Sequence, residues 1–154
     1  MQYPHFLAVD GSSWEEQAHP IAIAWSLADG SIKTTMIQPE DDWDDWDFAL
    51  EDLHGINQDT LYQRGETCYS VLRELEHDLE QPRVATDDRE RCELLLEKLY
   101  EGCGRDVSLE IDDYLDDVQD TSRIEEVRDQ LQLSQQMCED RVRLMLEVWA
   151  RENG

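Results

Sequence analysis

Aspartate side chains at three places in this sequence have the chemistry to bind a metal ion. Asp10 follows the apolar residues 6–9 and precedes a turn at 11–13, so a strand would present its carboxylate at the end of a sheet. Asp87 stands at the start of a predicted helix, and Asp140 lies within the last one. Mg²⁺ often binds proteins through one or two carboxylates and several waters. These aspartates are therefore candidate ligands for Mg²⁺ or Mn²⁺, with Asp10 and Asp140 as the candidate catalytic pair.

The same aspartates also suit ordinary structural roles. Asp87 and Asp88 fall in the first turn of their predicted helix, where negative charge stabilises the helix dipole. Asp140 and Arg141 flank the apolar stripe of the last helix, so both have some freedom to point toward a cleft or toward solvent. The sequence leaves the metal-binding and the structural interpretation open.

An antiparallel meander at the start of the chain must position Asp10. Three β-rich runs, at residues 6–9, 21–27 and 31–37, are joined by a polar loop and by a turn at 28–30. Connections this short favour antiparallel pairing of successive strands. The first strand would then carry Asp10 at its end.

Helices alternate with single strands after the meander. Apolar residues at helical spacing predict the helices, and short β-compatible runs predict the strands. The helices fall at about 49–56, 58–63, 66–80, 87–100, 122–133 and 134–152, and the strands at 83–86 and 107–111. This order predicts an α/β fold with a ribonuclease H-like mixed sheet, in which three antiparallel strands precede parallel ones and helices flank the sheet. We expect a single domain over residues 1–154.

Several short motifs occur in a definite order along the chain. They are residues 6–13, then 20–24 with Asp29 and Gly30, then 53–56 with Leu61 and Gly65, then 84–87 and 95–100. In order and spacing they resemble the DEDD superfamily of proofreading-type 3′-to-5′ exonucleases, over nearly the whole chain. The resemblance implies four carboxylates that hold two divalent ions about 4 Å apart, one to activate water and one to stabilise the leaving oxygen. It also implies a histidine near the third motif as general base.

The chain departs from this family pattern at most metal-binding positions. Asp10 is the only acid in a segment where the family has Asp-x-Glu. Cys92 stands at the usual second-motif aspartate, and Gln135 stands at the usual histidine, five residues before Asp140. Thiolate suits zinc better than magnesium, and glutamine cannot take a proton from water. Two acids would bind one cation weakly and would not clamp two.

Two functional hypotheses follow from these departures. The first is a catalytically impaired pseudo-exonuclease, without a cofactor, that acts by protein binding in nucleic-acid metabolism. The alternative is a divergent metal-dependent 3′-to-5′ exonuclease acting on single-stranded DNA or RNA. It would hold Mg²⁺ or Mn²⁺ with Asp10, Asp140 and either Asp87 or Asp88.

The charge of the chain bears on its partners. The sequence has 38 acidic against 13 basic residues, a formal net charge of -25. Such a chain repels nucleic-acid phosphates at long range, which favours a basic protein partner over direct nucleic-acid binding. A third hypothesis is an acidic nucleic-acid mimic, which requires carboxylates at phosphate-like spacing on one face. A solvated surface typical of a salt-rich or acid-biased proteome explains the same composition.

Residues 41–47 combine five aspartates with two tryptophans. One interpretation is an acidic interaction patch with aromatic anchors. The other is structural: the tryptophans fix the loop to the core, while the aspartates face water and cap the next helix. The structural interpretation is favoured.

The cysteines and the hydropathy pattern indicate the compartment. Four widely spaced cysteines predict reduced thiols, without a disulfide framework or a metal clip. No apolar run approaches the roughly 20 residues that a membrane span needs, so we expect a cytoplasmic protein without a membrane partner. Relatives of this kind often form homodimers. Leu144, Leu146 and Val148 would form such an interface if exposed, or part of the core if buried.

Overall fold

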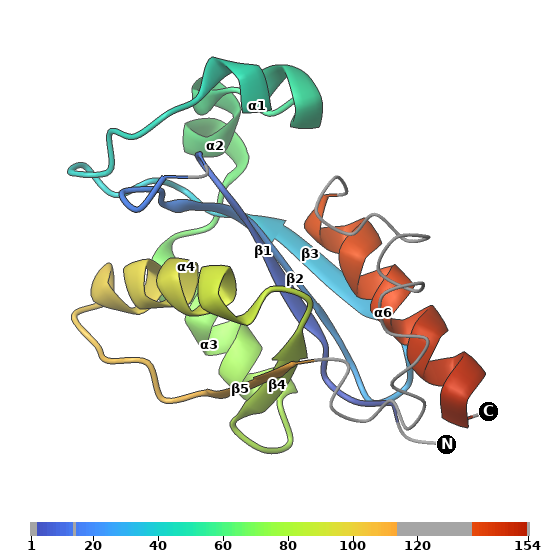
Figure 1. Cartoon of the computed structure of the whole chain (residues 1–154). Coiled ribbons are helices and arrows are strands. Elements are labelled where there is room, and N and C mark those ends of the chain that lie inside the picture. Colours follow the sequence, from blue (N-terminus) through green and yellow to red (C-terminus); the bar gives the residue numbers. More distant parts are fainter. Residues whose placement is uncertain (1–2, 14, 114–136, 154) are drawn as a thin grey trace.

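The first three strands form the predicted antiparallel meander. The computed structural model describes residues 3–13, 15–113 and 137–153 of the chain. The meander consists of β1 (Leu7–Gly11), β2 (Pro20–Ser26) and β3 (Ile32–Met36), with β2 in the middle (Figure 1). Apolar and β-branched side chains dominate β2, and all seven of its residues are buried, as expected for a central strand.

Two further strands extend the sheet in the parallel sense. β4 (Arg83–Thr86) and β5 (Glu110–Asp113) pair in parallel, and Val84 lies opposite Ile111. One isolated parallel bridge, Phe6 to Ala85, places β4 beside β1, and the Ala85 N–H donates to the His5 carbonyl at 3.0 Å. The predicted mixed sheet of antiparallel and parallel strands is therefore confirmed, although a single bridge joins its two parts.

Helices cover both faces of this sheet. The helix α6 lies along one face of the meander, while α3 and α4 lie on the other, and α1 and α2 lie beyond one end of the strands (Figure 1). Their bounds are α1 (Phe48–His54), α2 (Gln58–Arg64), α3 (Cys68–Asp78), α4 (Arg89–Glu101) and α6 (Cys138–Asn153). Among the described residues, no helix is long and apolar enough to cross a membrane.

The alternation of side chains along β1 separates two cores. Leu7 and Val9 belong to the core beneath α3 and α4, whereas Phe6 and Ala8 belong to the core beneath α6. Successive residues of a strand point to opposite faces. Asp10 continues the second set and therefore lies on the α6 side of the sheet.

Several predicted boundaries shift in the structure. The helix expected at 66–80 begins at Cys68, because the Thr67 side chain accepts from the Ser70 N–H and caps it. The strand expected at 107–111 begins instead at Glu110 and ends at Asp113. Its early apolar residues, Val107 and Leu109, pack against the core without pairing with β4. The helix expected at 122–133 and residues 134–136 lie outside the described residues.

The tryptophans of residues 41–47 anchor that loop, as the structural interpretation predicts. Trp43 is 8 % exposed and belongs to the core. Asp47 caps α1 by accepting a hydrogen bond from the Ala49 N–H at 2.9 Å. In the last helix, Leu146 and Val148 are buried, so their side chains belong to the core. All four cysteines carry free thiols.

Candidate functional site

Two candidate ligands meet where β1 and β4 end. Because these strands run in parallel at their bridge, their carboxyl ends lie at the same edge of the sheet. Asp10 lies near the end of β1, and Asp87 follows β4 directly. The start of α6 faces them from one side of the sheet. Asp10 and Asp87, which the sequence separates by 77 positions, are thus brought to one place.

Asp10 holds the start of α6. Its Oδ2 atom accepts a hydrogen bond from the backbone N–H of Cys138, the first residue of that helix, at 2.9 Å. The first turn of a helix has unpaired N–H groups and a positive dipole end, so a carboxylate is stabilised there. The side chain of Asp10 is only 12 % exposed. A structural contact therefore already occupies one of its two oxygens.

A buried arginine lies between Asp10 and Asp87. Arg141, on the first turn of α6, is 5 % exposed. Its Nη2 atom donates to the Val9 carbonyl at 2.8 Å and lies 3.9 Å from Oδ1 of Asp10. Its Nε atom lies 3.6 Å from Oδ2 of Asp87. We call Asp10, Asp87 and Arg141 the Arg141 cluster.

The electrostatics of the Arg141 cluster are those of a buried ion pair. Burial lowers the pKa of Arg141, but the carboxylates of Asp87 and Asp10 outweigh this effect and leave its pKa above the ordinary value. Burial raises the pKa of Asp87, and the positive charge of Arg141 offsets this only in part. Because isolated buried charges are very costly, each member of the cluster depends on the others.

A second arginine borders the cluster. Arg91, on α4, donates from Nη2 to the Ser13 carbonyl at 2.6 Å. Burial and the nearby charge of Arg141 lower its pKa. Asp88 caps the same helix, since its Oδ1 accepts from the backbone N–H of Arg91 at 3.2 Å. The structural role predicted as an alternative for Asp88 is thus observed.

The remaining candidate residues lie elsewhere or have other properties. Asp140 points away from the cluster, has a half-exposed side chain, and pairs with Arg143 at 2.9 Å. Cys92 is buried, and burial raises the pKa of its thiol to about 12, so it carries no thiolate at neutral pH. Gln135 lies outside the described residues. The structure thus joins Asp10 with Asp87 and leaves out Asp140.

Solved structures with a similar fold include two forms of exonuclease I. Exonuclease I from Methylocaldum szegediense superimposes with a TM-score of 0.55 at 15% identity, over 77% of this chain and 29% of its own. Exonuclease I of E. coli, in complex with a dA16 oligonucleotide, gives 0.56 at 14% identity, over 74% of this chain and 28% of its own. The chain has an exonuclease-like fold. It spans less than a third of the length of these enzymes.

The similarity to these enzymes is one of fold, because sequence identities of 15% and 14% do not support a shared activity. No protein-family model matches the sequence, and no curated protein matches it. The predicted resemblance to DEDD exonucleases is confirmed at the level of the exonuclease-like fold. Binding and catalysis must therefore be argued from the side chains themselves.

The described residues at this edge of the sheet do not fit a divalent cation. A guanidinium already lies between the two carboxylates, and it would repel a second positive charge. Within the described ranges, no group of three or more His, Cys, Asp or Glu side chains is placed to hold a metal ion. Catalysis by Asp10 and Asp140, and metal binding by Asp10, Asp140 and Asp87, remain predictions for experiment.

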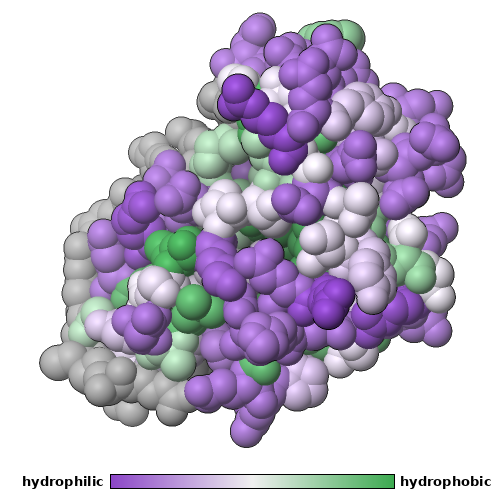
Figure 2. Space-filling model, turned by 180° about the vertical axis from the view of Figure 1, so that it is seen from behind, coloured by the Kyte–Doolittle hydropathy of each residue, from purple (hydrophilic) through white to green (hydrophobic). Residues whose placement is uncertain are grey.

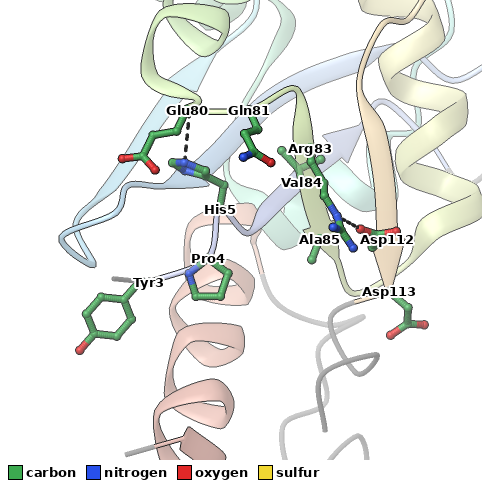
Figure 3. A pocket seen from close by; sticks show the side chains of 10 residues that line it. All are labelled: Tyr3, Pro4, His5, Glu80, Gln81, Arg83, Val84, Ala85, Asp112 and Asp113. Atoms are coloured by element: carbon green, nitrogen blue, oxygen red, sulfur yellow. Dashed lines mark hydrogen bonds and ion pairs between the residues drawn. The ribbon is translucent and has the colours of Figure 1, made fainter. Parts of the chain in front are cut away.

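A separate pocket of about 420 Å³ lies along β4 and the segment before β1 (Figure 3). Arg83 and Asp112, from neighbouring strands, point toward each other there and form an ion pair. His5 lies at its rim, with Nδ1 2.8 Å from the Ser26 carbonyl and Nε2 accepting from the Glu80 N–H at 3.5 Å. None of the predicted site residues lines this pocket.

Proposed function

We propose that this protein is a catalytically impaired pseudo-exonuclease that acts in nucleic-acid metabolism by binding a basic protein. The observation that carries the proposal is the guanidinium of Arg141 between Asp10 and Asp87. Both carboxylates lie at strand ends of an exonuclease-like fold, where hydrolysis by two metals would require them to be available. Here they neutralise an arginine.

The energetics of the Arg141 cluster support this proposal. A metal ion would have to displace a guanidinium that also donates to the Val9 carbonyl. Leaving one partner of a buried ion pair without its counter-charge costs about 3–5 kcal/mol. The half-exposed Asp140 does not compensate, because it pairs with Arg143 on the outer side of α6. A free-energy cost of this size opposes the displacement of Arg141 by a weakly bound Mg²⁺ ion.

The surface charge supports a basic partner. The net charge of -25 repels phosphate and attracts lysine- and arginine-rich surfaces. Figure 2 shows mostly hydrophilic residues on the face seen from behind, with small separate hydrophobic patches. Phe48, Tyr62 and Tyr69 are exposed, and aromatic rings contact cationic side chains favourably. Such a surface suits association through charge more than through a large apolar interface.

A nuclease assay tests the loss of catalysis. Purified protein would be incubated with 5′-labelled single-stranded DNA or RNA, with Mg²⁺ and separately with Mn²⁺, beside the double variant Asp10→Ala/Asp140→Ala. We expect no shortening from the 3′ end beyond that of the double variant. A ladder that the wild-type protein produces and the double variant does not would establish the alternative, a divergent exonuclease.

A binding assay tests the partner. Cell extract would be passed over the immobilised protein, and the bound proteins would be eluted with rising salt and identified. The control is a variant in which Asp41, Asp42 and Asp44 are changed to Asn. These three side chains are exposed. We expect a basic protein whose retention weakens with salt and in the variant. Release of that partner by added DNA would support a nucleic-acid mimic, and failure to capture any basic protein would contradict the partner proposal.

A further inference from the structure

Arg141 has three polar neighbours from different parts of the chain. It reaches the Val9 carbonyl and Asp10 on β1, and Asp87 after β4, from its own position on α6. We infer that Arg141 supplies the positive charge of this site. Its side chain occupies the place between Asp10 and Asp87 where a divalent cation would otherwise bind. The inference goes beyond the proposed function, since it concerns what the two carboxylates would bind without the arginine.

The charge balance at the site supports this role. Two buried carboxylates carry two negative charges, and Arg141 supplies one positive charge between them. The N-terminal end of α6 supplies part of another, through the Cys138 N–H that donates to Asp10. Without Arg141, both carboxylates would lose the positive charge that each of them approaches, and a buried carboxylate without a counter-charge favours uptake of a proton or a cation.

Arg141 is fixed by its hydrogen bond to the Val9 carbonyl, whereas it acts on the two carboxylates through charge more than through hydrogen bonds. Its Nε atom is buried and has no hydrogen-bond partner among the described residues. The nearest acid, Asp87, lies 3.6 Å away from Nε, beyond ordinary hydrogen-bond length. Arg141 thus holds both carboxylates chiefly as a positive charge, a role that a metal ion can also perform.

The space at the site is filled by the same side chain. The pocket between β4, α4 and α6, which Asp87 and Arg141 line, leaves no room for a water-sized sphere. Removing the guanidinium would open this volume next to Asp10 and Asp87. Arg91 lines the same pocket, but to take the place of Arg141 it would have to give up the hydrogen bond from its Nη2 to the Ser13 carbonyl at 2.6 Å. A hard cation bound by carboxylates and waters suits the opened volume.

The test is Mn²⁺ binding to Arg141→Ala, measured by electron paramagnetic resonance of free Mn²⁺ and by the thermal unfolding midpoint. We expect one Mn²⁺ per chain, bound about tenfold more tightly than the wild-type protein binds any Mn²⁺. The unfolding midpoint of the variant should rise with Mn²⁺ more than that of the wild type. Both readouts are independent of nuclease activity.

Two controls separate this site from the general acidity of the chain. Arg143→Ala removes the same charge and frees the exposed carboxylates of Glu139 and Asp140, so it should gain no tight site. The double variant Arg141→Ala/Asp87→Asn should lose the site that Arg141→Ala gains. Equal Mn²⁺ binding by wild type, Arg141→Ala and Arg143→Ala would overturn the inference.

Arg141→Gln serves as a second variant if Arg141→Ala does not fold by itself. It keeps more side-chain volume, removes the charge, and should gain the same single Mn²⁺. Folding of either variant that is recovered by Mn²⁺ supports the inference. Variants that stay unfolded at saturating Mn²⁺, or that fold and bind none, would overturn it. Failure here would leave the nuclease and partner assays of the wild-type protein unaffected, so the two proposals fail separately.

Discussion

The Arg141 cluster and the aspartate-rich loop at residues 41–47 handle negative charge in opposite ways. In the cluster, two nearly buried carboxylates share a buried guanidinium, and one of them, Asp10, also accepts from a helix N–H. In the loop, Asp41, Asp42 and Asp44 face water, while Trp43 and Trp46 pack against the cores. A charge in water needs no partner, whereas a buried charge requires one. The acidity of this chain is thus unbalanced on its surface and balanced where it is buried.

The largest expected effect comes from removing the cation of the cluster. Arg141→Met retains an unbranched aliphatic side chain but leaves two buried carboxylates without their counter-charge, so the free energy of unfolding should fall by about 3–5 kcal/mol. Urea denaturation at pH 7 measures this loss. The matched control is Arg143→Met, whose exposed pairs should be worth roughly 0.2–1 kcal/mol. Equal losses of unfolding free energy in the two variants would show that the buried and the exposed arginine contribute equally to stability.

The contribution of Asp87 to the free energy of unfolding should change with pH in the opposite direction to that of Asp78. Burial raises the pKa of Asp87, so its contribution to stability is full below pH 3.8 and is lost as pH rises through the folded-state pKa. The difference in unfolding free energy between wild type and Asp87→Asn should therefore be larger at pH 4 than at pH 7.

Asp78 provides the opposite case for the same measurement. Burial raises its pKa, but hydrogen bonds from Lys33 and Trp25 outweigh this and leave its pKa below the ordinary value. Its contribution is present above pH 3.8 and is lost as pH falls through the folded-state pKa. For Asp78→Asn the difference from wild type should shrink toward acid pH. The same trend in both variants would contradict the assignment.

The smallest expected effect lies within the loop itself. Asp47→Ala removes the cap of α1 and should lower the free energy of unfolding by about 1 kcal/mol. Asp44→Ala, in the same loop and exposed, should change it by less than about 0.5 kcal/mol. Chemical denaturation of the two variants side by side measures the contrast. A larger loss for Asp44→Ala would mean that the exposed carboxylate of Asp44 also has a structural partner.

Much of the fold was predictable because local patterns determine it. Apolar and β-rich runs bounded by turns predicted the meander, and the short β-compatible run at 83–86 predicted β4 with the bounds that the structure shows. Asp10 was correctly expected at the end of a strand. The predicted start of β5 was wrong because the pairing of β5 with β4, in which Ile111 lies opposite Val84, sets the register of the strand. That pairing is a tertiary effect that local sequence does not encode.

The site was predicted only in part. The sequence pattern identified Asp10 and Asp87 but paired Asp10 with Asp140, which the structure places on the outer side of α6. From the sequence alone, Arg141 has some freedom to point toward a cleft or toward solvent. A signal for it existed, since Arg141 lies three residues after Cys138 and four before Met145, within the buried face of the helix. A charged residue on such a face needs a counter-charge, and the sequence does not show which distant acid provides it.

The order in which the chain is synthesised gives the Arg141 cluster a further consequence. Asp10 and Asp87 are made well before Arg141, which is 131 and 54 positions further along. Until α6 emerges, the adjoining ends of β1 and β4 carry negative charges without this counter-charge, so their close approach is opposed. Completion of this part of the sheet during translation should therefore await the synthesis of α6.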